Sequence, residues 1–166
     1  QVKRQAKTLS ETLLKDTRSM FILGKGCDKY IADESALKIK EISYIHTESY
    51  SASSLKHGPF ALLDADFPVI IINCEDEHDE KITSCYHEVK ARHSPQILIT
   101  TSTSTTSTST TSTSTTSTSQ IIVPKNKHYG ALLALIPLQL MSYYLSINKG
   151  INPDTPKNLA KVVTVD

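Results

Sequence analysis

The sequence predicts an α/β fold in which a mostly parallel β-sheet is covered by helices on both faces. Short, fully apolar runs such as residues 69–72 (VIII) indicate strands buried on both sides. Segments with helical spacing of apolar residues separate these runs. The first apolar run ends in Gly24-Lys25-Gly26, a turn that suits the step from a strand into a helix. Strands that alternate with helices in this way are typical of parallel sheets.

Each predicted element follows from a local pattern. Residues 2–16 carry apolar side chains at helical spacing and predict an amphipathic helix, and residues 20–23 predict a buried strand. By the same criteria, we expect helices at 31–44, 59–63, 79–91 and 129–148, and strands at 47–52, 69–72, 97–99 and 121–123. Pro137 lies inside the last predicted helix, where we expect a kink.

One segment has no apolar residue at all. Every residue from 100 to 119 is Ser or Thr, in four copies of Thr-Thr-Ser-Thr-Ser. Such a segment can bury nothing, so we expect a disordered loop between two strands, with a few Thr residues extending the preceding strand. The alternative is a mucin-like glycosylated stalk, which would need a secretory route.

Length and composition exclude several classes of protein. The chain has 166 residues, a net charge of +1 and mixed charges, so we expect no nucleic-acid partner and no basic membrane patch. We expect no membrane-spanning segment, because the apolar runs are too short to span a bilayer, and we see no secretory signal. The spacing of Cys27, Cys74 and Cys85 fits no zinc site, so we expect no metal and no cofactor. Idle thiols fit a reducing compartment, and we expect a cytoplasmic protein.

The predicted helix at 31–44 carries charged residues on one face. Glu34, Lys38 and Glu41 fall within a sector of about 60° at helical spacing. A carboxylate beside a lysine can move a proton next to a carbonyl group while the ammonium stabilises the developing negative charge. The alternative is a solvated face with an ordinary ion pair.

Three further positions could take part in chemistry. His57 lies in Lys-His-Gly-Pro, a turn that would expose its ring, and either proton transfer or a local hydrogen bond is compatible with that place. Lys161 lies in the tail, and a lysine that loses its proton can form an imine with a ketose. Gly24-Lys25-Gly26 could present N–H groups to a phosphate, although it matches neither a dinucleotide nor a P-loop fingerprint, so a tight turn is the alternative.

Three segments together resemble a known family. ALKIKEISYIHTESYSASSLKHGP, PLQLMSYYLSINKGINPDTPKNLAK and the closing VVTVD are similar to the C-terminal sugar-isomerase (SIS) domain of glucosamine-6-phosphate synthases. The resemblance extends from about residue 21 to residue 166 and fails only across the Ser/Thr tract. It implies a five-stranded parallel sheet sandwiched by helices, a flavodoxin-like three-layer α/β/α arrangement. On this basis we expect a second SIS domain at 1–150, with its low-complexity loop at 100–119, and a tail at 151–166 that carries the active-site lysine.

The resemblance also implies an activity. Enzymes of this family make glucosamine 6-phosphate from fructose 6-phosphate and glutamine, an early step in hexosamine biosynthesis. By motif, Glu41 resembles the carboxylate that moves the proton between sugar carbons 1 and 2, and Lys38 its electrostatic partner. His57 resembles the ring-opening histidine, supplied to the neighbouring subunit of a homodimer. Lys161 resembles the lysine that forms the imine, and the backbone of Ala160 is expected to touch the sugar.

The sequence also departs from the family pattern, and these departures leave a second function open. The glutaminase domain and the first SIS domain, which carries the phosphate cradle in the family, have no counterpart in these residues, so we expect little or no activity from the chain by itself. Ser35 and Ser54 replace a glycine and a glutamate of the family pattern. A non-catalytic SIS module that binds a phosphosugar or mediates dimerisation is the alternative.

Overall fold

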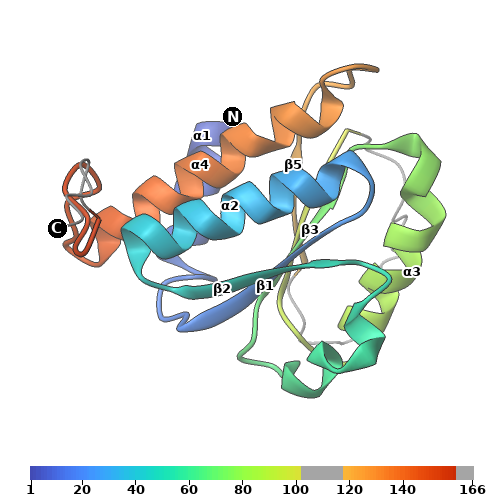
Figure 1. The fold of residues 1–166 in the computed structure, drawn as a ribbon, viewed down its shortest axis with the longest axis horizontal. Helices are drawn as coiled ribbons and strands as arrows, with labels where there is room; N and C mark the ends of the chain where they lie inside the picture. Colours follow the sequence, from blue (N-terminus) through green and yellow to red (C-terminus); the bar gives the residue numbers. More distant parts are fainter. Residues whose placement is uncertain (102–117, 160–166) are drawn as a thin grey trace, which may run out of the picture.

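Five parallel strands form the centre of the computed structural model, which describes residues 1–101 and 118–159 (Figure 1). The strands lie in the order β2-β1-β3-β4-β5. They are β1 (Ser19–Gly24), β2 (His46–Ser51), β3 (Val69–Asn73), β4 (Gln96–Thr100) and β5 (Thr118–Ile122). This sheet confirms the predicted fold class, because the strand order is that of flavodoxin-like doubly wound proteins.

Helices cover both faces of the sheet. The α-helices are α1 (Val2–Glu11), α2 (Cys27–Ser43), α3 (Asp79–Lys90) and α4 (Gly130–Asn148), and three short 3₁₀ turns are η1 (Leu55–His57), η2 (Pro59–Leu62) and η3 (Asp76–His78). On one face α4 lies between α1 and α2 and packs against both (Figure 1). The other face is covered by α3 and by the segment that contains η1 and η2.

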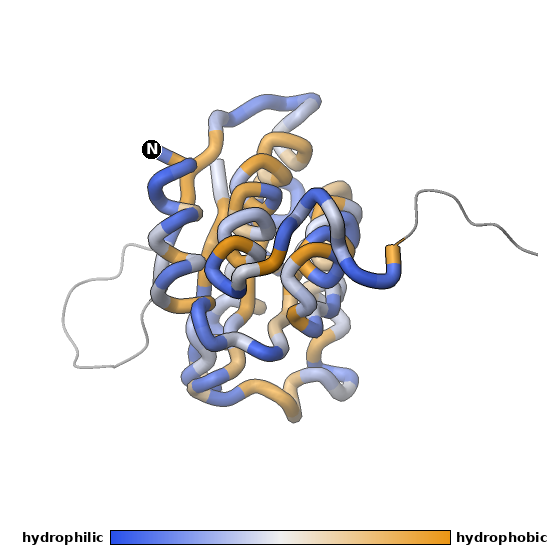
Figure 2. Tube along the Cα trace, turned by 90° about the vertical axis from the view of Figure 1, so that its left-hand side faces the viewer, coloured by the Kyte–Doolittle hydropathy of each residue, from blue (hydrophilic) through white to orange (hydrophobic). Residues whose placement is uncertain are grey.

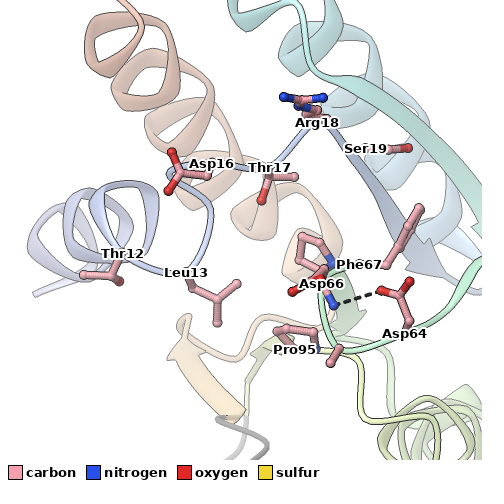
Figure 3. A pocket seen from close by; sticks show the side chains of 12 residues that line it. Thr12, Leu13, Asp16, Thr17, Arg18, Ser19, Asp64, Asp66, Phe67 and Pro95 are labelled. Carbon is pink, nitrogen blue, oxygen red and sulfur yellow. Dashed lines mark hydrogen bonds between the residues drawn. The ribbon is translucent and has the colours of Figure 1, made fainter.

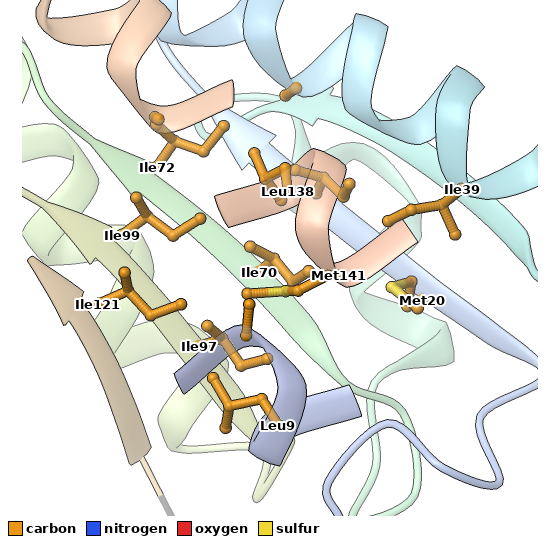
Figure 4. Close-up of a cluster of buried hydrophobic side chains, with 14 of the residues drawn as sticks. Leu9, Met20, Ile39, Ile70, Ile72, Ile97, Ile99, Ile121, Leu138 and Met141 are labelled. Carbon is orange, nitrogen blue, oxygen red and sulfur yellow. The ribbon is translucent and has the colours of Figure 1, made fainter. Parts of the chain in front are cut away.

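Alternate residues of each strand feed two separate cores. Ile70 and Ile72 of β3 belong to the cluster beneath α1, α2 and α4, whereas Ile71 belongs to the cluster beneath α3 (Figure 4). This alternation follows from the two-residue period of a strand. Each fully buried isoleucine contributes about 1.5–3 kcal/mol relative to an exposed one. Apolar residues, orange in Figure 2, accordingly concentrate in the interior.

Three predicted elements differ from the observed ones. The first helix ends at Glu11 rather than at residue 16, and the chain then turns so that Leu14 is buried. The second helix begins at Cys27, four residues earlier than expected, because its first turn is held by polar contacts rather than by apolar periodicity. The predicted helix at 59–63 is η2, a short 3₁₀ turn that follows Gly58, whose φ is 145°.

The Ser/Thr tract is not a loop over its whole predicted length of 100–119. Thr100 is the last residue of β4, which confirms that the tract extends the preceding strand. The departure is at the other end, where β5 begins at Thr118 rather than at residue 121. Thr is a good strand former, and pairing between β4 and β5 supplies the hydrogen bonds that the tract cannot gain from burial. The central part of the predicted loop, residues 102–117, lies outside the described residues.

The helix α4 is more apolar than the sequence analysis allowed. Over its 19 residues it carries no charged side chain and continues through Pro137. Within the part of the chain that the structure describes, α4 alone is long and apolar enough to span a membrane by length and composition. Yet 44% of its most apolar window is buried inside the protein, where Leu138 and Met141 pack against the sheet.

The turn between β1 and α2 is tightly packed against the end of β3. Gly24 lies so close to the next helical turn that a Cβ atom there would overlap the backbone carbonyl of Asp28 and lie 2.7 Å from the backbone nitrogen of Lys29. The Asp28 carboxylate is buried, and its Oδ2 accepts a hydrogen bond of 2.8 Å from the backbone N–H of Cys74, just after β3. Its Oδ1 finds no hydrogen-bond partner among the described residues, and burial raises the pKa of Asp28 to about 6.

We predict that Gly24→Ala destabilises the fold strongly. Because the obstacle is backbone rather than a flexible side chain, relief requires α2 to shift, and we expect a loss of about 3 kcal/mol or more in the free energy of unfolding. Gly150→Ala is the matched control: Gly150 has a φ of 68° but open space around it, so only backbone strain of about 1 kcal/mol is expected. Urea denaturation of both variants measures the difference, and equal losses would contradict this packing.

We also predict a pH-dependent effect of Asp28→Asn. The pKa of Asp28 is higher in the folded protein than the 3.8 of a free side chain. Between these two pKa values the folded state therefore binds more protons at Asp28 than the unfolded state does. Stability is therefore lost as the pH rises through about 6. Asparagine cannot ionise and escapes this loss. Relative to the wild type, the variant should gain about 2 kcal/mol in unfolding free energy between pH 4.5 and pH 7.5, measured by urea denaturation. A constant difference would show that Asp28 does not titrate in this range.

Candidate functional site

Lys38 and Glu41 form an ion pair on the outer side of α2. The Nζ atom of Lys38 lies 2.8 Å from Oε2 of Glu41 and 3.7 Å from Oε1 of Glu34. The side chains of Lys38 and Glu41 are 38% and 26% exposed, so the pair is reachable from solvent but partly covered. The hydrogen bond to Glu41 raises the pKa of Lys38 above its usual value. Lys38 therefore stays charged, which suits an electrostatic partner of Glu41 better than an amine nucleophile.

The pair lies on the side of α2 that faces α4. On the other side of the helix, Asp33 accepts a hydrogen bond from Ser49 of β2, which is an edge strand. Lys38 is about 140° around the helix from Asp33. Since α4 packs against α2 on the side away from this edge (Figure 1), helical geometry places Lys38 and Glu41 on the outer side of α2, toward α4.

The tail returns to the carboxyl end of α2. Tyr44 ends this helix in a left-handed conformation with a φ of 56°. Its hydroxyl oxygen accepts a hydrogen bond of 2.8 Å from the backbone N–H of Lys157, and the Nζ atom of Lys157 lies 4.4 Å from the centre of its ring. Nearby, Lys149 donates to the carbonyl of Ser43 at 3.2 Å, and burial lowers the pKa of Lys149.

Two of the predicted site residues, Ala160 and Lys161, lie outside the described residues.

His57 lies far from this pair in the same chain. It ends η1 and is exposed, and the following Gly58 has a φ of 145°. η1 follows the carboxyl end of β2, whereas the last turns of α2 lead to the amino end of the same strand. The structure thus brings Lys38 and Glu41 together, whereas His57 follows the opposite end of β2.

The turn at Gly24-Lys25-Gly26 does not present a free anion site. The backbone N–H of Cys27, at the start of α2, donates a hydrogen bond of 2.8 Å to the carboxylate of Glu75. Gly26 faces the same carboxylate and the ring of His78. A hydrogen bond between the Cys27 side chain and Glu75 also raises the pKa of the Cys27 thiol. The position where a phosphate could bind is therefore taken by a side chain of the same protein, which favours the tight-turn interpretation.

Asp28 and Glu75 are the contacts that the sequence analysis missed. Asp28 lies in the first turn of α2, four residues after β1, and Glu75 lies two residues after β3; the neighbouring carboxyl ends of β1 and β3 mark the topological switch point of this sheet. Acidic residues that follow two neighbouring parallel strands are the sequence signal that could have predicted these contacts. Helical periodicity does not reveal them, because they are polar residues beside a glycine turn.

Two cavities lie away from the Lys38–Glu41 pair. One, of about 510 Å³, opens at the amino ends of the strands, and its lining includes Asp16, Arg18 and Asp66 (Figure 3). The other, of about 290 Å³, lies beside η1 and is lined in part by Lys56 and Lys81. Across residues 1–101 and 118–159, no cluster of three or more His, Cys, Asp or Glu side chains could hold a metal ion.

The model of one protein family matches most of the chain. Residues 13–149 match the SIS domain. A probable glutamine–fructose-6-phosphate aminotransferase (isomerizing) from Acanthamoeba polyphaga mimivirus is 43% identical over 89% of this chain and 23% of its own length. The aminotransferase of the same name from Chlorobaculum tepidum is 43% identical over 92% of this chain and 24% of its own length. The chain thus spans about a quarter of the length of these curated relatives.

A solved structure agrees with these sequence relatives. The C-terminal domain of glucosamine-fructose-6-phosphate aminotransferase from Francisella tularensis is 33% identical and superposes with a TM-score of 0.80. The similarity covers 93% of this chain and 42% of that one. With the five-stranded parallel sheet and the family model over residues 13–149, these findings place the chain in the SIS domain family.

Proposed function

We propose that the chain supplies part of the site at which fructose 6-phosphate and glutamine-derived ammonia are converted to glucosamine 6-phosphate. The ion pair between Lys38 and Glu41, with the tail attached to Tyr44 close by, is the observation that carries this proposal. The names of the relatives from mimivirus and Chlorobaculum tepidum support the same reaction.

In the proposed reaction, Lys161 attacks the C2 carbonyl of the open-chain ketose and forms an imine with loss of water. Ammonia then replaces the lysine at C2. Glu41 removes a proton from C1 and returns it to C2, which converts the 2-imine into the amino aldehyde. Lys38, whose charge is maintained by Glu41, stabilises the negative charge that develops on the sugar oxygen. Ala160 lies beside Lys161 and contacts the sugar through its backbone.

His57 is proposed to open the sugar ring in the site of a neighbouring subunit. Its exposure and its distance from Glu41 along β2 support an action between subunits of a homodimer rather than within one chain. The remaining parts of the site, the glutaminase and the phosphate-binding SIS domain, are proposed to come from polypeptide beyond these residues. The exposed Cys27 and the buried Cys74 and Cys85 are all free, which supports a reducing, cytoplasmic location.

A non-catalytic role is the second candidate, and one observation favours it. Lys38 and Glu41 are three residues apart on the exposed side of α2, where an ordinary surface ion pair explains their contact without any substrate. Binding of fructose 6-phosphate without turnover in the chimera described below would support this role.

We predict that borohydride traps a covalent imine at Lys161. The test uses a chimera in which this chain replaces the matching segment of the Chlorobaculum tepidum relative, so that the other domains are present. After incubation with fructose 6-phosphate and borohydride, mass spectrometry should find the sugar adduct on Lys161. Lys157→Arg should keep the adduct, because Lys157 holds the tail and does not react. An adduct that survives Lys161→Ala would remove Lys161 from the mechanism.

We also predict that Glu41→Gln reduces synthesis of glucosamine 6-phosphate by about 10²–10⁴-fold in the same chimera, because the amide cannot carry the proton. Glu34→Gln is the matched control, since Glu34 also faces Lys38 but at the longer distance of 3.7 Å. The control should retain activity within a few-fold. Equal effects of the two substitutions would mean that only the charge around Lys38 matters, not a proton carrier at position 41.

A further inference from the structure

The cavity of about 510 Å³ at the amino ends of the strands combines apolar and acidic side chains. Its apolar lining includes Leu13 and Phe67. Acidic side chains come from two different loops: Asp16 from the loop between α1 and β1, and Asp64 and Asp66 from the loop before β3 (Figure 3). We call the space between these five residues the amino-end cavity. Its volume lies in the range that small-molecule sites usually have.

Thr17 supplies an unsatisfied hydroxyl group to the same cavity. The residue lines the cavity and is only 8% exposed, and its backbone N–H donates to the carbonyl of Leu14 at 3.2 Å. Its hydroxyl, by contrast, has no hydrogen-bond partner in the part of the chain that the structure describes. Figure 3 shows the hydroxyl oxygen directed into the space between Leu13 and Asp66. Burial of a hydroxyl group without a partner is unfavourable, so this group is available to bind a ligand.

The acidic side chains of the cavity are not neutralised by their neighbours. Among residues 1–101 and 118–159, no ion pair involves Asp16, Asp64 or Asp66. Arg18 also belongs to the lining, but it forms no ion pair within the same residues, and Figure 3 shows its guanidinium group directed away from Asp66. Three carboxylates and one guanidinium group leave the lining with a net charge of −2. The cavity therefore attracts cations.

We propose that the amino-end cavity binds a linear polyamine. The carboxylates do not converge on one point, since no group of three His, Cys, Asp or Glu side chains among the described residues could hold a metal ion. A polyamine instead carries separated positive charges, which can reach Asp16 on one side and Asp64 and Asp66 on the other. Hydrogen bonds from ammonium groups to carboxylates are strong. The methylene groups between the amines pack against Leu13 and Phe67.

The same features disfavour other occupants. Arg18 is the single basic side chain of the lining, and three carboxylates oppose it, so an anion would be repelled. A basic peptide shares the ammonium groups of a polyamine, but an extended chain needs a groove rather than a cavity. The Thr17 hydroxyl accepts one hydrogen bond from an amine of the ligand, which a fully hydrated metal ion or a purely apolar ligand would not provide.

This inference does not rest on the proposed function. Lys38, Glu41 and His57 do not line the amino-end cavity. Binding of a polyamine is measured with the unreacted protein, whereas the imine at Lys161 is measured after borohydride treatment. Either result can therefore fail without the other.

The test is calorimetric titration of the chain with spermidine at low salt. The wild type should bind at one site, and Asp64→Asn/Asp66→Asn should weaken the affinity about tenfold or more, because two carboxylates are lost. Asparagine at position 64 can still accept the 2.8 Å hydrogen bond from the backbone N–H of residue 66, so the loop should keep its shape. Glu77→Gln/Glu80→Gln is the matched control. It removes the same charge from exposed positions on η3 and α3, outside the cavity, and should leave the affinity unchanged.

Thr17→Val separates a binding role from a structural one. Valine has nearly the shape of threonine but lacks the hydroxyl group. Because that hydroxyl has no partner in the described part of the chain, its loss should not lower the urea midpoint. The affinity for spermidine should fall about fivefold, since one hydrogen bond to the ligand is lost. A variant that loses stability but binds spermidine normally overturns the proposal.

Other ligands and measurements decide the remaining outcomes. Mg²⁺ that binds as tightly as spermidine would mean diffuse attraction of cations and overturns the proposal, and so does spermidine that binds all the variants alike. Tighter binding of pentalysine would assign the cavity to a peptide and also overturns it. If the double variant loses its circular dichroism signal, amide chemical shifts of the wild type replace it. Spermidine should then shift the signals of Thr17 and Asp66, and shifts confined to other regions overturn the proposal.

Discussion

The hydrogen bond from the backbone N–H of Cys74 to the buried carboxylate of Asp28 links the two halves of the sheet at the point where the strand order reverses. β1 leads through α2 to one edge of the sheet, while β3 begins the path to the other edge. Asp28 starts α2, and Cys74 directly follows β3, so one side chain fixes the helix against the neighbouring strand end. The close approach at Gly24 lies beside this contact, and Lys38 and Glu41 lie farther along the same helix.

The sequence was sufficient to predict the sheet and most of its helices. Runs such as Val69–Asn73 are apolar on both faces, and only a covered parallel sheet suits such strands. It was less informative where polar contacts determine structure. The first turn of α2 depends on Asp28 and on the bond from Cys27 to Glu75, and neither contact leaves a periodic pattern. At the end of the Ser/Thr tract, composition predicted a loop where the structure has the first residues of β5, because pairing with β4 can order residues that bury nothing.

The candidate site was predicted in part for a related reason. Helical spacing alone places Lys38 beside Glu41, because residues three apart meet on a helix surface. The residue types of Lys161 and His57 left several roles open, and only the resemblance to a family selected one for each. No local rule could have brought the tail back to α2, since that contact joins Tyr44 to Lys157, 113 positions away in the chain. Contacts of this kind are properties of the assembled fold.

The contact between Tyr44 and Lys157 holds the tail only weakly. It consists of one exposed hydrogen bond and one contact between an ammonium group and an aromatic ring, which together are worth about 2 kcal/mol. A contact of that strength is open in a few per cent of molecules at any moment. Lys157 can therefore leave the ring of Tyr44 at a small cost in free energy, and neither α2 nor the sheet has to rearrange when it does.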